Sequence, residues 1–320
     1  MKSLLTLNEL SGTEILSLIA LAQDVKKNPS AYTHALSGKT LLMIFEKPSL
    51  RTRLSFDVGI KQLGGFGIVL DTASTPLGQK ESLEDTARVC GRYAQCIMAR
   101  VFEQKTLEIL AKFSGVPVIN GLSNDHHPVQ ILSDLLTIKE KTGKLAGLTL
   151  AYLGDGNNNV THSLLLGCAM AGIHIRVACP SAMLPNKAIF NEALLIARKS
   201  QTEMTITQEP AEAVKNADIV YTDSWMSYHI NPQEKDSRLR ALMPYQVNQK
   251  TVQAAKKDYL FMNCLPAMRE YEQTAEIIDG KHSIVFDQAE NRLHMQKALL
   301  LWLLSDASKT AQSKNRKQEK

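Results

Sequence analysis

Short apolar runs rich in Val, Ile and Leu alternate with helical patterns along most of the chain, and this alternation constrains the fold more than any other feature. Strands separated by helices pair in parallel, and a parallel sheet needs helices on both of its faces. A long helical pattern from about residue 127 to 142 divides the alternation into two series. The sequence therefore predicts an α/β fold with two doubly wound parallel-sheet domains.

Each series supplies its own strands and helices. In the first series we expect strands at 40–45, 66–70, 95–99 and 116–120, with helices near 51–63, 82–93 and 104–113. In the second series we expect strands at 148–154, 174–179, 204–208, 218–223, 259–263 and 283–286. The amphipathic stretch 288–304 predicts a final helix that packs against the body. We therefore assign residues 1–140 and the C-terminal helix at about 288–305 to a first domain, and 141–287 to a second.

The basic charge of the chain is concentrated at its C-terminal end. The 320 residues carry a net charge of +5, and Ala307–Lys320 holds five Lys or Arg residues and one Glu. The rest of the chain is therefore close to neutral, which argues against a nucleic-acid partner. We expect residues 306–320 to form a basic, disordered tail.

The location of the protein is predicted from its apolar runs and its cysteines. No run approaches the length of a membrane span, and the acidic, amphipathic N-terminus is unlike a signal peptide. The five cysteines are an odd number and form no CxxC pair. We therefore expect a cytoplasmic protein without disulfides, a membrane association or a zinc site.

The segment FEKPSLRTRLSF, residues 45–56, joins a predicted strand to a predicted helix. Pro48 favours a turn and Ser49 is a suitable N-cap, so a helix N-terminus with free N–H groups follows the strand. Arg51 and Thr52 add a guanidinium and a hydroxyl, which suit phosphate or carboxylate. Ligands bind beyond the carboxyl ends of parallel strands, so this segment predicts an anion site, with Arg53 in a structural role.

The same segment resembles the carbamoyl-phosphate signature of the aspartate and ornithine carbamoyltransferases. Similar motifs follow in the order of that family, over roughly residues 40–303, and they favour its ornithine branch. They are Arg100 at the end of CIMAR, His127-Pro-Val-Gln130, GDGNNNVTHSLL at 154–165, Asp223 with Trp225, Asn263-Cys264-Leu265-Pro266, and FDQAENRLHMQKALL at 286–300. The resemblance implies an active site in the cleft between two domains.

The resemblance also implies which residues bind the dianion carbamoyl phosphate. They are Ser49, Leu50, Arg51, Thr52, Arg100, His127, Gln130, Cys264, Leu265 and Arg292. Among them, it implies catalytic roles for Arg51, Thr52, Arg100, His127 and Cys264. Arg51, Thr52 and His127 would stabilise the oxyanion that forms when an amine attacks the carbonyl.

The acceptor implied by the resemblance is L-ornithine, which would attack directly and give citrulline and phosphate without a covalent intermediate. The expected ornithine-binding residues are Asn159, Asp223, Ser227 and Tyr228, with Cys264 beside the aspartate. A lone carboxylate at a strand end suits an ammonium group. The resemblance implies no cofactor or metal, a homotrimer or a multiple of it, and a part in arginine metabolism.

Four departures from the family pattern bear mainly on the acceptor. Leu50 replaces a threonine, and Pro76, close to Lys80, replaces a glutamine in a loop that in the family reaches a neighbouring subunit. Tyr228-His229 replaces Met-Gly, and Asn263 replaces a histidine. Asn263 can still donate a hydrogen bond, but it does not titrate near neutral pH.

Three alternatives remain open, and the departures motivate the first two. The acceptor could be another amine, such as putrescine or an acylated ornithine, or the chain could bind carbamoyl phosphate without catalysis. The third alternative is a nicotinamide-dependent oxidoreductase, since GDGNNN follows a predicted strand. Asn159 stands where the third glycine of a dinucleotide fingerprint would be, so the sequence disfavours this reading.

Overall fold

The computed structural model describes residues 2–72, 77–227 and 230–305. The chain divides into two compact units, of which the first runs to Leu132 and resumes at Arg292, and the second is Ser133–Asn291. Both boundaries fall inside helices, α5 (Pro128–Thr142) and α12 (Val285–Leu304), so each of these helices contributes to both units.

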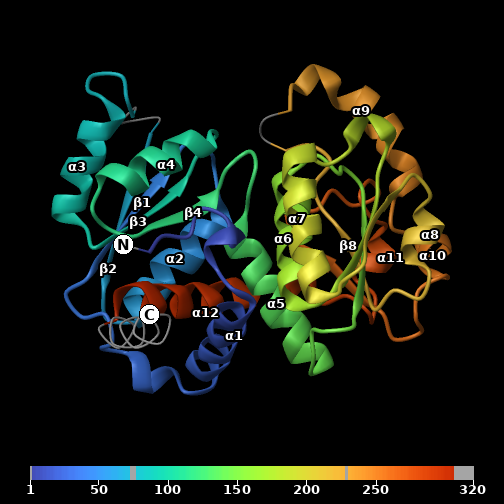
Figure 1. Ribbon diagram of the computed structural model, residues 1–320, viewed down its shortest axis with the longest axis horizontal. Helices are drawn as coiled ribbons and strands as arrows, with labels where there is room; N and C mark the ends of the chain where they lie inside the picture. Colours follow the sequence, from blue (N-terminus) through green and yellow to red (C-terminus); the bar gives the residue numbers. More distant parts are fainter. Residues whose placement is uncertain (1, 73–76, 228–229, 306–320) are drawn as a thin grey trace. The chain divides into compact units, whose positions relative to one another are not determined.

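The first unit is built on four parallel strands in the order β2-β1-β3-β4. The strands are β1 (Thr40–Phe45), β2 (Phe66–Asp71), β3 (Cys96–Arg100) and β4 (Val118–Leu122). The helices are α1 (Gly12–Lys27), α2 (Leu50–Gln62), α3 (Leu83–Tyr93) and α4 (Gln104–Phe113), with the end of α12. In Figure 1, α3 and α4 lie on one side of this sheet, and α1, α2 and α12 on the other.

The alternation of side chains along β1 explains why both faces of this sheet are covered. Leu42 and Ile44 pack into one apolar cluster with residues of α3 and α4, among them Ala87 and Leu107. The intervening Met43 is also fully buried. Successive side chains of a strand point to opposite faces, so β1 presents apolar surface to helices on both sides.

The second unit repeats this architecture with five parallel strands in the order β7-β6-β5-β8-β9. The strands are β5 (Thr149–Leu153), β6 (His174–Ala178), β7 (Met204–Thr207), β8 (Ile219–Thr222) and β9 (Leu260–Asn263). The helices are α6 (Asn159–Ala171), α7 (Lys187–Ser200), α8 (Pro210–Val214), α9 (Lys235–Leu242), α10 (Gln249–Val252) and α11 (Ala275–Ile278). The predicted α/β class with two doubly wound parallel sheets is confirmed.

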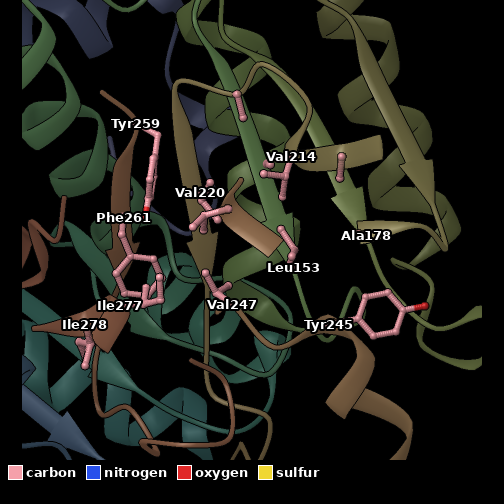
Figure 2. Close-up of a cluster of buried hydrophobic side chains, with 14 of the residues drawn as sticks. Leu153, Ala178, Val214, Val220, Tyr245, Val247, Tyr259, Phe261, Ile277 and Ile278 are labelled. Atoms are coloured by element: carbon pink, nitrogen blue, oxygen red, sulfur yellow. The ribbon is translucent and has the colours of Figure 1, made fainter. Parts of the chain in front are cut away.

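One face of the second sheet packs against short helices rather than long ones. Figure 2 shows Leu153, Val220 and Phe261, from three neighbouring strands, in a cluster with Val214 of α8 and Ile277 of α11. Burial of such side chains contributes about 1.5–3 kcal/mol each. These contacts cover one face of β5, β8 and β9.

Two predicted strands differ from the structure. The run 283–286 is not a strand, because Ser283 forms only an isolated bridge with Phe261 and α12 begins at Val285. A four-residue apolar run does not distinguish a strand from the first turn of a buried helix. The strand predicted at 116–120 is shifted to Val118–Leu122, where Leu4 pairs beside Ile119.

Two features are absent from residues 2–72, 77–227 and 230–305. No helix there is long and apolar enough to cross a membrane. No group of three or more His, Cys, Asp and Glu side chains in these ranges could hold a metal ion.

Candidate active site

The ends of β1 and β3 bring the first two predicted anion-binding segments together. Phe45, the last residue of β1, pairs with Arg100, the last residue of β3. The Glu46 N–H then donates to the Arg100 carbonyl at 2.9 Å. The turn that leads from β1 into α2 therefore starts beside Arg100.

The start of α2 presents residues of differing exposure. Ser49 occupies the N-cap position, but its side chain makes no capping hydrogen bond, so the expected side-chain cap is absent there. Leu50 is 67% exposed, whereas Thr52 is 1% exposed. Arg51 is half-buried and Arg53 is exposed. The Ser49 hydroxyl therefore does not accept a hydrogen bond from the first turn of α2.

Arg292 connects this turn to α5. Its guanidinium donates to the Gln130 Oε1 at 2.5 Å and to the Thr52 Oγ1 at 3.2 Å. All three side chains are buried. Residues that are far apart in sequence, and that the resemblance assigns to one ligand, thus make direct contact in the first unit.

His127 lies immediately before α5 in strongly positive surroundings. Burial lowers the pKa of His127 well below 6.5, and the charges of Arg292, Arg100 and Lys47 lower it further. The imidazole is therefore neutral at physiological pH. Cations that converge on a buried neutral group create a positive potential that suits an anionic ligand.

Lys47 is a member of this group that the sequence analysis did not identify. It is 2% exposed, its Nζ donates to the Asn124 Oδ1 at 2.5 Å, and it lies 4.4 Å from the centre of the Phe102 ring. Burial and the charge of Arg100 lower the pKa of Lys47 to about 8. A lysine is rarely fully buried, so there was little reason in the sequence to expect Lys47 in the site. The one indication was its position between an apolar strand and Pro48.

In the second unit, Asp223 and Cys264 meet at the ends of the neighbouring strands β8 and β9. The Cys264 Sγ donates to the Asp223 Oδ1 at 2.9 Å. Burial raises the pKa of Asp223, while the hydrogen bond from Cys264 and one from the Ser224 backbone lower it. The pair places a carboxylate and a thiol side by side. An ammonium group bound there could replace the thiol as the hydrogen-bond donor to Asp223.

Asn159 is the first residue of α6, and its neighbour Asn158 fixes the start of that helix. The Asn158 Oδ1 accepts from the Thr161 N–H at 2.8 Å, and its Nδ2 donates to the Tyr152 hydroxyl at 2.9 Å. Tyr152 lies on β5, which pairs with β8. This buried network places Asn159 at the same edge of the sheet as the end of β8.

The segment after β9 has its own internal hydrogen bonds. The Asn263 Oδ1 accepts from the Leu265 N–H at 2.8 Å, and its Nδ2 donates to the Gln273 Oε1 at 2.9 Å. One of the two donor hydrogens of the Asn263 amide is therefore used within the protein. Leu265 has a φ of 56°, an unusual value for a residue with a Cβ.

The structure describes two further predicted residues, Ser227 and Lys80, and others lie outside the described ranges. Ser227 is half-buried after β8, and Lys80 is exposed. Tyr228, His229, Pro76 and the predicted tail at 306–320 lie outside the described residues.

Comparisons with protein families assign both halves of the chain. Residues 2–140 match the aspartate/ornithine carbamoyltransferase carbamoyl-P binding domain, and residues 146–303 match the Asp/Orn binding domain of the same family.

Individual relatives give the same assignment. A protein of Anoxybacillus flavithermus named ornithine carbamoyltransferase is 49% identical over 306 residues, which are 95% of this chain and 96% of the relative. The structure of ornithine carbamoyltransferase from Pyrococcus furiosus is 43% identical, with a TM-score of 0.91 over 95% of this chain and 97% of that one. An anabolic ornithine carbamoyltransferase from Campylobacter jejuni is 38% identical, with a TM-score of 0.89 over 95% and 99% of the two chains. The chain therefore belongs to the aspartate/ornithine carbamoyltransferase family.

Proposed function

We propose that this protein transfers the carbamoyl group of carbamoyl phosphate to the side-chain amine of L-ornithine, giving citrulline and phosphate. The observation that carries the proposal is the convergence of Arg292, Arg100 and Lys47 on the neutral His127. A dianion is stabilised by that potential, and a neutral imidazole still carries one N–H that can donate to a developing oxyanion.

The roles in the first unit follow from charge and donor geometry. Ser49, the Leu50 backbone, Arg51, Thr52 and Arg100 hold the phosphate. His127, with Arg51 and Thr52, stabilises the oxyanion, while Gln130 and Arg292 orient the carbamoyl group. Support comes from the hydrogen bonds that Arg292 donates to Gln130 and Thr52.

The roles in the second unit concern the amino acid. Asp223 and Cys264 bind the amines of ornithine, and Asn159, Ser227 and Tyr228 bind its remaining polar groups. Cys264 and Leu265 also contact carbamoyl phosphate. The hydrogen bond between Cys264 and Asp223 supports this assignment, because two side chains this close can both contact one small cation. Ornithine attacks directly, so positioning and oxyanion stabilisation supply the rate enhancement.

A citrulline assay with a panel of amines tests the proposal. L-Ornithine is expected to be the best acceptor, and equal or faster turnover of putrescine or an acylated ornithine would contradict the proposal. Arg51→Ala should lower kcat/KM at least about a hundredfold, since it removes a charged donor from the transition state. Arg53→Ala is the matched control, because this nearby arginine is exposed, and it should leave turnover nearly unchanged.

The assembly and the location are also part of the proposal. Leu54 and Val58 on α2, and Phe66 and Ile68 on the edge strand β2, are apolar and exposed in the first unit. Apolar residues exposed at a sheet edge support self-association, and we assign the chain to a homotrimer. The cysteine usage of the sequence supports a cytoplasmic location.

A further inference from the structure

Glu272 is a buried acid that lies between β9 and α11 in the second unit and has no role in the chemistry above. Its side chain is 0% exposed. One carboxylate oxygen accepts from the Trp225 N–H at 3.2 Å, and the other accepts from the Met268 N–H at 2.6 Å. A single carboxylate therefore joins the chain after β8 to the chain after β9.

These two segments carry the groups that we assign to the acceptor. Asp223 and Ser227 flank Trp225 after β8, and Cys264 precedes Met268 after β9. The bond between Cys264 and Asp223 connects the segments once, and Glu272 connects them a second time through their backbones. Two separate connections fix the distance and the angle between segments better than one, because a single bond still allows rotation.

The backbone carbonyl of Trp225 also has a hydrogen-bond partner. The Arg238 Nε donates to the Trp225 carbonyl at 3.2 Å, and Arg238 also pairs with the Asp155 carboxylate. The Trp225 ring is 0% exposed, and a Cβ added at Gly154 would come within 3.1 Å of its Nε1. Glu272 thus completes the anchoring of the peptide that leads from Asp223 to Ser227.

We propose that Glu272 is a positioning residue for the acceptor amine, and that its ionised carboxylate holds the segments after β8 and β9 in their binding arrangement. This inference rests on the proposed function of the same site. Glu272 makes no contact with the reacting atoms in this role. It acts through Trp225 and Met268 on Asp223, Ser227 and Cys264.

The ionisation of Glu272 makes this anchoring sensitive to pH. Burial is the largest influence and raises the pKa of Glu272 to about 7, the charge of Asp223 also raises it, and the backbone hydrogen bonds lower it. The charged groups around the anchored peptide are Asp223, Arg238 and Asp155. Protonation converts one acceptor oxygen of Glu272 into a donor, so one of the two N–H groups loses its partner as the pH falls below about 7.

Glu272→Gln tests the proposal, because the amide keeps the shape and replaces one acceptor with a donor. The KM for ornithine should rise roughly tenfold or more, as expected for the loss of a hydrogen bond to a charged group, while carbamoyl-phosphate affinity by calorimetry stays within about twofold. Glu276→Gln on the exposed face of α11 is the matched control and should change neither value. An unchanged KM for ornithine, or an equal loss of affinity for both substrates, would overturn the positioning role.

A second readout does not depend on activity. Trp225 and Trp302 are the two tryptophans, so in a Trp302→Phe protein the fluorescence reports Trp225 alone. We expect its emission to change with a midpoint near pH 7, and we expect Glu272→Gln in the same background to remove that change. A flat titration between pH 5 and 9 in the Trp302→Phe protein refutes the ionisable anchor. If ornithine proved not to be the acceptor, this titration would still be expected, so the two failures are distinguishable.

Discussion

At the scale of single residues, the first unit depends on how charge surrounds His127. The imidazole lies among three cations and is buried, and both conditions disfavour its protonated form. Its pKa in the folded protein is therefore below the value of 6.5 that it has when solvated. This difference links the stability of the fold to pH.

The free energy of unfolding should fall as the pH drops below about 6.5, because the unfolded chain then binds a proton that the folded chain excludes. His127→Gln, which cannot be protonated, should make this fall shallower. Urea unfolding at a series of pH values measures the slope. His34→Gln, at an exposed histidine, is the control and should leave the slope unchanged. A slope for His127→Gln identical to that of the unmodified protein would contradict the neutral imidazole.

Cys264→Ala gives a second prediction at this scale. The change removes one of the two side chains that we assign to the amines of ornithine, so the KM for ornithine should rise about tenfold, the order expected for the loss of one hydrogen bond to a charged group. The affinity for carbamoyl phosphate should change less. Cys90→Ala, at a half-buried cysteine on α3, provides the comparison in steady-state kinetics. Equal effects of the two substitutions on ornithine would argue against the assigned role.

At the scale of elements, the groups that we propose for the site lie at strand ends and helix starts. Asn158 illustrates this, because it caps α6 and at the same time donates to the Tyr152 hydroxyl and to the Asp155 carbonyl. The start of α6 is therefore tied to the end of β5. Asn159, the next residue, takes its position from that connection.

Asn158→Ala should lower the free energy of unfolding by about 1–3 kcal/mol, since a cap and two buried hydrogen bonds are lost. It should also raise the KM for ornithine through Asn159. Asn186→Ala removes the cap of α7, where the side chain accepts from the Ala188 N–H at 2.9 Å. That control should lower stability in urea unfolding without changing the KM. A normal KM in Asn158→Ala would show that the cap does not position Asn159.

At the scale of the whole molecule, the exposed apolar residues of α2 and β2 bear on assembly. Phe66 is 64% exposed and Ile68 is 53% exposed on a strand at the edge of its sheet. An exposed apolar edge strand on a chain that stays monomeric would favour aggregation, so a covering partner is expected.

Phe66→Lys combined with Leu54→Lys should convert the proposed trimer into monomers, because two charges would be desolvated at the interface. Analytical ultracentrifugation measures the change in mass. Leu195→Lys, at a residue of α7 that is 59% exposed in the second unit, is the matched control. A trimer that persists in the double variant would place the interface elsewhere.

The sequence determined the order and kind of most elements, because the hydrophobic period of a segment is a local property. The parallel strands and their helices follow from alternating Val, Ile and Leu runs. The strand predicted at 283–286 was wrong for the same local reason, because four apolar residues suit both a strand and a helical turn. The motif residues were also visible, and Thr52, Gln130 and Arg292 prove to be in contact within the first unit.

Only the tertiary structure decided the electrostatics. Lys47 and Glu272 look like ordinary surface charges in the sequence, and the structure buries both and shifts their pKa toward neutrality. Burial removes water, and the energy of a charge in a low dielectric depends on groups that are distant in sequence and close in space. The sequence thus named most of the groups that we propose for the site, and the fold determined how deeply each of them is buried and what it contacts.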